Sequence, residues 1–243
     1  YYCADRYLKL GEGRNKALEQ VTGDLIAFLD CDDQWVSHKL ERQVSEFMKN
    51  PDISLCYSNY YDYFETAQRK ELHLTRTQPS GRVFSAALRQ YPVGILTAMM
   101  RSTVLQGLDH YFDPELNLCE DYDFFMRIIL DHFVSYIHEP LALYRIHNDN
   151  LTTVHFEVFP DEQVYCLEKF KVLAQDACDL RLIDEDIARK KLEKIFRSEF
   201  LNHRYMAFFK GFFKLSRKPS FKTLLYYSCR YVYSCIKSVL KFF

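Results

Sequence analysis

The apolar run Leu25–Leu29 is followed directly by Asp30, Asp32 and Asp33, and this junction restricts the possible folds more than any other feature of the sequence. A run of apolar residues without polar alternation is typical of a strand buried on both faces. Such strands belong to parallel sheets that helices cover on both sides. Because ligands of open α/β sheets bind beyond the carboxyl ends of the strands, we expect the three carboxylates at a ligand site.

Three carboxylates so close together repel one another unless a cation or hydrogen-bond donors compensate their charge. A hard divalent cation that bridges a diphosphate would supply this compensation, and oxygen ligands suit Mg²⁺ or Mn²⁺. One carboxylate would then remain to hold a ribose hydroxyl. The alternative interpretation is an acidic turn that merely caps the next helix.

The segments beside the acidic cluster predict helices and a further strand. Gly11 and Gly13 lead into a short helix over residues 14–20. After the cluster, Ser37 is expected to cap a helix, and residues 53–57 then predict a second buried strand. The apolar residues of the helix after Ser37 are expected on one face: Leu40, Val44, Phe47 and Met48. This alternation of strand and helix predicts an α/β fold.

The expected architecture is a mixed, mostly parallel sheet flanked by helices. Residues 58–92 are less regular and predict a surface excursion. Further strands are predicted at residues 95–100, 134–137 and 141–146. The pattern then becomes helical, which predicts a catalytic domain at residues 1–155 and a helical extension at residues 156–243.

A second acidic group, Glu120 to Asp123, opens a helix for which Asn117 and Glu120 have the form of a capping box. Carboxylates are ordinary in a first helical turn, because the helix dipole favours negative charge there. In isolation these residues therefore need no function. The same dipole is expected to keep Asp121 ionised, and only an ionised carboxylate can accept a proton from an attacking hydroxyl.

Two further groups could contact an anion. Arg14 and Asn15 open the first helix, and a helix N-terminus beside a guanidinium favours a nucleotide contact. His147 follows the last predicted strand, where it could bind the metal or neutralise a leaving diphosphate. Spacing alone leaves a purely structural role open for each of these residues.

Together, four segments resemble the family 2 glycosyltransferases, which are inverting enzymes of GT-A fold. TGDLIAFLDCDDQW at residues 22–35 closely follows the family's Asp-x-Asp-Asp signature. The other matching segments are GRNKAL at residues 13–18, where Gly13 replaces the usual alanine, EDYD at 120–123 and YRIHNDNLT at 144–152. Each motif is weak alone, but four in family order are specific.

The resemblance implies a role for each matching residue. Asp121 would be the catalytic general base. The nucleotide sugar would be bound by Arg14, Asn15, Asp30, Asp32, Glu120 and His147, and the metal by Asp32, Asp33 and His147. The family usually begins with another nucleotide-binding strand, so the chain is expected to lack an N-terminal piece. Trp35 is the only tryptophan, which argues against the Gln-x-x-Arg-Trp element of the processive branch.

The expected function is metal-dependent, inverting transfer of a sugar from a nucleoside diphosphate sugar to a glycan, lipid-linked or protein acceptor, as in polysaccharide biosynthesis. One alternative is a non-catalytic module of GT-A fold. Another is a metal-dependent nucleotidyltransferase. A phosphatase with an aspartate nucleophile would need a downstream lysine and a further acidic loop, and neither is evident.

Charge is distributed unevenly along the chain. The formal net charge of −1 argues against nucleic acid as the main partner. No acidic residue follows Glu199, whereas nine basic residues follow it.

Residues 220–243 mix basic and apolar residues without an uncharged run of about 18, which predicts an interfacial amphipathic helix. We therefore expect a cytoplasmic protein, peripheral on the anionic inner face of the membrane; a helix packed on the catalytic domain is the alternative.

Overall fold

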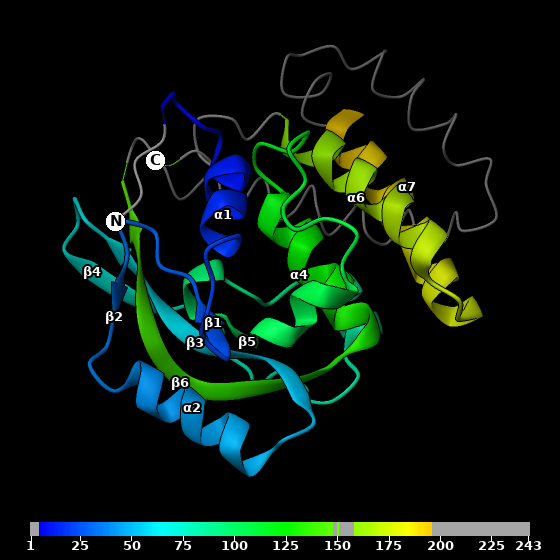
Figure 1. Ribbon diagram of the computed structural model, residues 1–243. Coiled ribbons are helices and arrows are strands. Elements are labelled where there is room, and N and C mark those ends of the chain that lie inside the picture. The colour runs from blue at the N-terminus through cyan, green and yellow to red at the C-terminus, as the bar shows by residue number, and fades with distance from the viewer. Residues whose placement is uncertain (1–4, 148–149, 151–157, 196–243) are drawn as a thin grey trace. The chain divides into compact units, whose positions relative to one another are not determined.

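The computed structural model describes residues 5–147, 150 and 158–195. The chain forms two compact units, Tyr1–Val154 and His155–Phe243. The first unit contains a six-stranded sheet (Figure 1). Its strands lie in the order β1 (Leu25–Ala27), β5 (Met99–Arg101), β3 (Ile53–Phe64), β6 (Phe133–Ile146) and β2 (Gln34–Trp35), and β4 (Arg69–Leu72) pairs with β3.

The sheet is mixed, as predicted, but fewer of its strands are parallel than expected. Only β3 and β6 run parallel among the strand pairs of the described residues, and the other four pairings are antiparallel. A parallel pair needs a long crossover, which here includes α4 (Glu120–Asp131) between the two strands. An apolar run indicates burial on both faces but carries no information about strand direction, so the prediction of a mostly parallel sheet was wrong.

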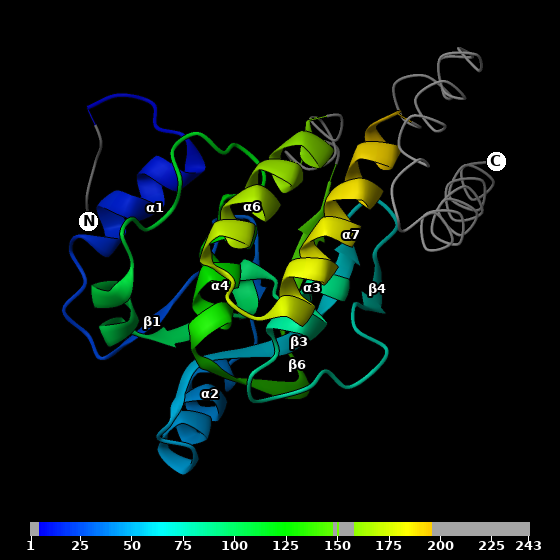
Figure 2. The same ribbon diagram turned by 90° about the vertical axis from the view of Figure 1, so that its right-hand side faces the viewer.

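Helices cover both faces of this sheet. Helix α2 (Lys39–Lys49) lies on one face, and α1 (Leu10–Leu18) and α4 lie on the other (Figure 1, Figure 2). Helix α3 (Phe84–Arg89) and two 3₁₀ turns, Ile95–Thr97 and Ser102–Gly107, complete the unit.

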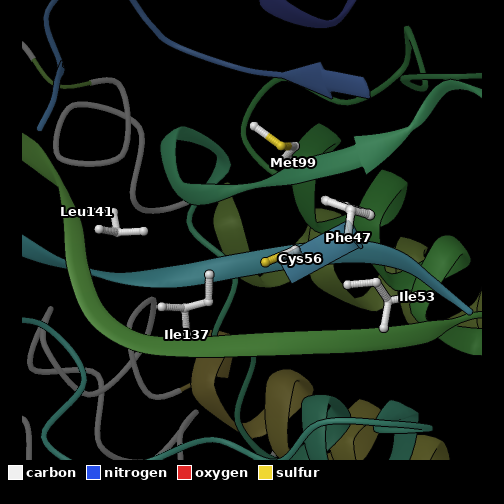
Figure 3. Close-up of a cluster of buried hydrophobic side chains, with 6 residues drawn as sticks. All are labelled: Phe47, Ile53, Cys56, Met99, Ile137 and Leu141. Carbon is white, nitrogen blue, oxygen red and sulfur yellow. The ribbon is translucent and has the colours of Figure 1, made fainter. Parts of the chain in front are cut away.

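A core forms where α2 meets the sheet. It is built from Phe47 of α2, Ile53 and Cys56 of β3, Met99 of β5, and Ile137 and Leu141 of β6 (Figure 3). All six side chains are buried. Fully burying one large apolar side chain contributes roughly 1.5–3 kcal/mol, so this cluster fixes α2 and the strands that carry the site.

The buried face of α2 differs from the predicted one. Of the four apolar residues expected to face the core, only Phe47 is buried, at 3% exposed, whereas Leu40, Val44 and Met48 are 47%, 37% and 78% exposed. Lys39 and Gln43 occupy the buried face instead.

Polar partners make this unexpected face possible. Gln43 Nε2 donates to the carbonyl of Thr97 at 2.8 Å, and Lys39 Nζ donates to Gln43 Oε1 at 2.6 Å. The Lys39 ammonium also lies 4.2 Å from the centre of the Trp35 ring. Burial lowers the pKa of Lys39 to about 8. Polar side chains can be buried when they are hydrogen-bonded, so hydrophobic periodicity alone chose the wrong face.

The starts of three helices also differ from the predictions. Helix α1 begins at Leu10 and includes both glycines, because the Glu12 carboxylate accepts a hydrogen bond from the Lys9 amide at 3.1 Å and so caps the helix earlier. Helix α2 has His38, not Ser37, at its N-cap. Helix α4 has Cys119 at its N-cap, so the expected capping box does not open it.

Gly11 lies inside α1 and not in a turn. A Cβ atom at this position would lie 3.4 Å from Cβ of Phe112, at the short end of ordinary contact. At this position α1 thus lies close to the segment that precedes α4.

The strand boundaries differ as well. β1 ends at Ala27, and Leu29 is 46% exposed, because the chain already turns towards the acidic loop. β3 extends to Phe64 and pairs with β4, so much of the predicted excursion is sheet. Residues 95–97 form a 3₁₀ turn. The two runs predicted at 134–137 and 141–146 are one strand, β6, with an irregular register at Ser58 and Asn59 of β3.

The second unit is helical where it is described. Helices α6 (Phe159–Leu173) and α7 (Ala177–Ile195) are joined by ion pairs from Lys171 to Asp184 at 2.6 Å and from Lys194 to Asp161 at 2.7 Å. No helix within the described residues is long and apolar enough to cross a membrane. The helix predicted at residues 220–243 lies outside the described residues.

Candidate active site

Arg14 joins two of the predicted motifs. Its guanidinium donates to Asp30 at 2.9 and 3.0 Å and to Oε1 of Glu120 at 2.7 Å. Asp30 follows β1, and Glu120 is the first residue of α4. The acidic loop and the first turn of α4 are therefore neighbours in space.

The charges around Arg14 compensate one another. Burial disfavours its positive charge, but Asp30, Glu120 and Asp121 outweigh this effect and raise the pKa of Arg14. The prediction that Arg14 marks an anion site at a helix N-terminus was wrong in its geometry, because Arg14 lies in the middle of α1. Its cation instead holds protein carboxylates together.

Asn15 fastens α1 to the segment before α4. Its amide nitrogen donates to the carbonyl of Phe112 at 2.8 Å, and its amide oxygen accepts from the Phe112 N–H at 2.8 Å. The Phe112 ring stacks on Phe124 of α4 with centroids 4.3 Å apart. These contacts give Asn15 a structural role, and the expected nucleotide contact stays a prediction.

The first turn of α4 carries two carboxyl groups that resist ionisation. Burial and the neighbouring charge of Asp121 raise the pKa of Glu120 to about 7, against the influence of Arg14. Burial also raises the pKa of Asp121, although Arg14 and a hydrogen bond from the Tyr122 amide oppose the rise. The expectation that the helix dipole dominates at Asp121 is corrected here, because desolvation is the largest influence. A raised pKa makes an ionised Asp121 a stronger base.

The acidic loop is also tied to the end of β6. Asp32 Oδ2 lies 3.2 Å from Nε2 of His147, which directly follows β6. Asp33 is buried, and its Oδ1 accepts a hydrogen bond from the Arg145 amide at 3.0 Å. Burial raises the pKa of Asp33 to about 6, and repulsion from Asp32 and Asp30 adds to the rise. These contacts bring the fourth predicted motif to the same place.

The predicted metal ligands are only partly gathered. Asp32 and His147 are neighbours and partly exposed, whereas Asp33 is engaged with the Arg145 amide. Within the described residues, the group of three whose ligand atoms all lie within 4.8 Å of one another is a different one, His110, Asp113 and Asp123. In that group Asp123 already forms an ion pair with Arg127 at 2.9 Å. A hard cation that binds a nucleotide needs only one or two protein carboxylates besides phosphate oxygens, so Asp32 with His147 fits such an ion.

Sequence reasoning missed several residues that build this region. Trp35 donates through Nε1 to the carbonyl of Leu96 at 2.8 Å and so anchors the chain just after the acidic loop. Arg127 donates to the carbonyls of His110 and Tyr111 and braces α4. Such contacts are distant in sequence, and the only signal for them was the tryptophan of the acidic motif.

The fold is that of the GT-A glycosyltransferases. The structure of Staphylococcus aureus TarS 1–349 in complex with UDP-GlcNAc superposes with a TM-score of 0.58, covering 85% of this chain and 61% of that one, at 15% identity. A second crystal structure of S. aureus TarS 1–349 gives a TM-score of 0.54, covering 79% of this chain and 52% of that one, at 17% identity. At such identities the likeness concerns the fold alone.

Sequence comparisons identify a family that part of the chain matches. The model of Glycosyl transferase family 2 matches residues 3–110. Escherichia coli WfgD, a UDP-Glc:alpha-D-GlcNAc-diphosphoundecaprenol beta-1,3-glucosyltransferase, is 33% identical over 134 residues, which are 55% of this chain and 49% of WfgD. E. coli WfaP, also a UDP-Glc:alpha-D-GlcNAc-diphosphoundecaprenol beta-1,3-glucosyltransferase, is 30% identical over 129 residues, which are 51% of this chain and 47% of WfaP.

Over residues 3–110, a little under half of its length, the chain is similar to glycosyl transferase family 2, and the relatives named above are glycosyltransferases. It spans about half the length of the curated relatives that it matches. The match of the family model ends before Glu120, so the first turn of α4 and the end of β6 join the site through the structural contacts described above.

Proposed function

We propose that this protein transfers a sugar from a UDP-sugar to a saccharide acceptor carried on a lipid diphosphate, as a step of polysaccharide biosynthesis. The observation that carries the proposal is the meeting of all four motifs: Arg14 binds Asp30 and Glu120, and His147 lies beside Asp32. UDP as the nucleotide is supported by the activities of WfgD and WfaP and by the UDP-GlcNAc complex of TarS. The lipid diphosphate is supported by the two E. coli relatives.

In the proposed reaction, Asp121 is the general base. Its ionised carboxylate takes the proton of one acceptor hydroxyl while that oxygen forms a bond to the anomeric carbon of the donor sugar. The bond from this carbon to the diphosphate breaks at the same time, and UDP leaves with the electron pair. A single displacement of this kind inverts the anomeric configuration, and no covalent enzyme intermediate is needed.

The acidic loop and His147 would hold the diphosphate end of the donor. Asp32 and His147 would bind Mg²⁺ or Mn²⁺, which would neutralise negative charge on the departing UDP when bound. In the alternative role, His147 would leave the metal to the carboxylate and donate a hydrogen bond to a phosphate oxygen instead, and Asp30 would accept one from a ribose hydroxyl. Arg14 keeps Asp30 and Glu120 in place for these contacts.

Attachment to an anionic membrane surface would suit a lipid-linked acceptor. The basic residues of 220–243 support this part of the proposal, since no acidic residue lies among them. The protein would then act at the cytoplasmic face of the membrane as a peripheral protein.

The proposal is tested with the full chain, a panel of UDP-sugars, Mn²⁺ and GlcNAc-diphosphoundecaprenol. We expect UDP release that depends on the acceptor, a product heavier by one sugar in mass spectrometry, and inverted anomeric configuration by NMR. Asp121→Asn serves as the matched control, because it keeps the size of the side chain and removes its basicity. Binding of UDP-sugars without any transfer would point to a non-catalytic module, and release of sugar 1-phosphate in place of UDP would point to a nucleotidyltransferase.

A further inference from the structure

Tyr91 lies beside the proposed general base. It follows α3, and its ring meets the ring of Tyr122 edge-on, with centroids 4.9 Å apart and planes at 89°. Tyr122 is the neighbour of Asp121 in the first turn of α4. Burial and then the charge of Asp121 raise the pKa of Tyr91 well above its ordinary value, so the phenol interacts with that carboxylate and remains protonated.

The Tyr91 hydroxyl is buried and has no hydrogen-bond partner among the residues that the structure describes. A buried hydroxyl without a partner costs free energy, and native proteins keep few such groups. The edge-on contact with Tyr122 needs only the ring, so a phenylalanine would make it without this cost. The hydroxyl therefore calls for a partner that the described residues do not supply.

A second buried oxygen, on the residue next to Asp121, also lacks a hydrogen-bond partner among the described residues. Oε1 of Glu120 holds Arg14, but Oε2 is buried without a partner in the described part of the chain. One such atom thus comes from the first turn of α4 and the other from the segment after α3. Both atoms belong to residues that pack around Asp121 or adjoin it in sequence.

We propose that the Tyr91 hydroxyl binds the acceptor saccharide, donating a hydrogen bond that holds the attacking hydroxyl against Asp121. This inference rests on the proposed function and adds to it a specificity residue for the acceptor. A saccharide suits the position because its neighbouring hydroxyls offer acceptors and donors to more than one protein group at once. Tyr91 is expected to have no part in binding the UDP-sugar, which the acidic loop holds.

The test compares Tyr91→Phe with the unaltered full chain, using GlcNAc-diphosphoundecaprenol as the acceptor and the UDP-sugar that supports transfer. We expect the acceptor KM to rise by about 3- to 10-fold, as for the loss of one neutral hydrogen bond. The KM for the UDP-sugar should not change. The melting temperature should stay the same or rise, because the variant removes a buried hydroxyl that has no partner.

Tyr136→Phe is the matched control. It also removes one phenolic hydroxyl, which contacts Nδ1 of His138 at 3.0 Å on β6, and it should leave both KM values unchanged. If Tyr91→Phe keeps the acceptor KM of an active unaltered chain, the inference is overturned while the proposed function stands. If it instead lowers the melting temperature and raises both KM values together, Tyr91 supports packing and the inference is likewise overturned. A chain that transfers no sugar from any UDP-sugar overturns the proposed function and this inference with it.

Discussion

Nε2 of His147 lies 3.2 Å from Oδ2 of Asp32, although these residues come from opposite ends of the first unit's sequence. The pair places a partly exposed carboxylate and an imidazole side by side at the end of β6. Asp32→Ala is expected to abolish metal-dependent binding of UDP, measured by calorimetry with and without Mn²⁺. His147→Asn should weaken that binding by roughly 10- to 100-fold, the range for residues that orient a metal ligand. His38→Asn, an exposed histidine paired with Glu139, is the control. Unchanged affinity in Asp32→Ala would exclude this metal site.

Asp121→Asn tests the general base. The amide cannot accept the proton of the attacking hydroxyl, so turnover should fall by roughly 10²- to 10⁴-fold. Binding of the UDP-sugar should remain nearly intact, because Asp121 is not expected to contact the diphosphate. Steady-state rates and calorimetry on the same preparation separate the two effects. Full turnover in the variant would remove Asp121 from the role of base.

The pH dependence of the reaction should reflect the burial of Asp121. Only the ionised carboxylate is active, so kcat/KM is expected to fall as the pH decreases through the raised pKa of Asp121. Arg14 opposes that rise, and Arg14→Gln should therefore move the acidic limb of the profile to higher pH. Lys16→Gln, on the exposed side of the same helix, should leave the limb in place. A limb at the same pH in all three proteins would contradict the assignment.

The buried face of α2 can be checked by a pair of alanine substitutions on adjacent residues. Phe47→Ala removes a core ring and should lower the free energy of unfolding by roughly 3–5 kcal/mol. Met48→Ala removes an exposed side chain and should change it by no more than about 0.5 kcal/mol. Urea unfolding followed by circular dichroism measures both values. Equal losses would mean that the helix presents a different face to the sheet.

Membrane attachment is tested by flotation with anionic vesicles of phosphatidylglycerol. We expect the full chain to float at low salt and to be released at high salt, since screening weakens such attraction. Replacing Lys222, Arg230, Lys237 and Lys241 by glutamate should abolish flotation, because each basic residue contributes about 1 kcal/mol near such a surface. Flotation that is insensitive to both changes would argue for another mode of attachment.

The sequence was sufficient for the parts of the site that are continuous along the chain. The acidic loop after β1, the acidic first turn of α4 and His147 at the end of β6 were each predicted from local patterns, and the mixed α/β fold was predicted with them. The meeting of Asp30 and Glu120 on one guanidinium was not predicted, because no local pattern records which distant carboxylates an arginine joins. The role of Asp121 itself stays a prediction.

The wrong predictions share one physical cause: tertiary contacts override the local preferences on which the predictions were based. Gln43 is buried because Thr97 accepts its hydrogen bond, and a pattern based on hydrophobicity counts it as a surface residue. Gly11 was interpreted as part of a turn, whereas it lies inside α1, close to Phe112. Tyr91 lies in a region without a motif, and only its buried hydroxyl drew attention to it.

The distance in sequence between Asp32 and His147, 115 positions, has a consequence for the protein during its synthesis. A ribosome that adds about 5–20 residues per second needs roughly 6 to 23 s to deliver His147 after Asp32 has been made. During that interval the emerging acidic loop has neither His147 nor the amide of Arg145 to hold it. Under the proposed function, the donor site of a nascent chain is therefore complete only after β6, the last strand of the described sheet, has left the exit tunnel.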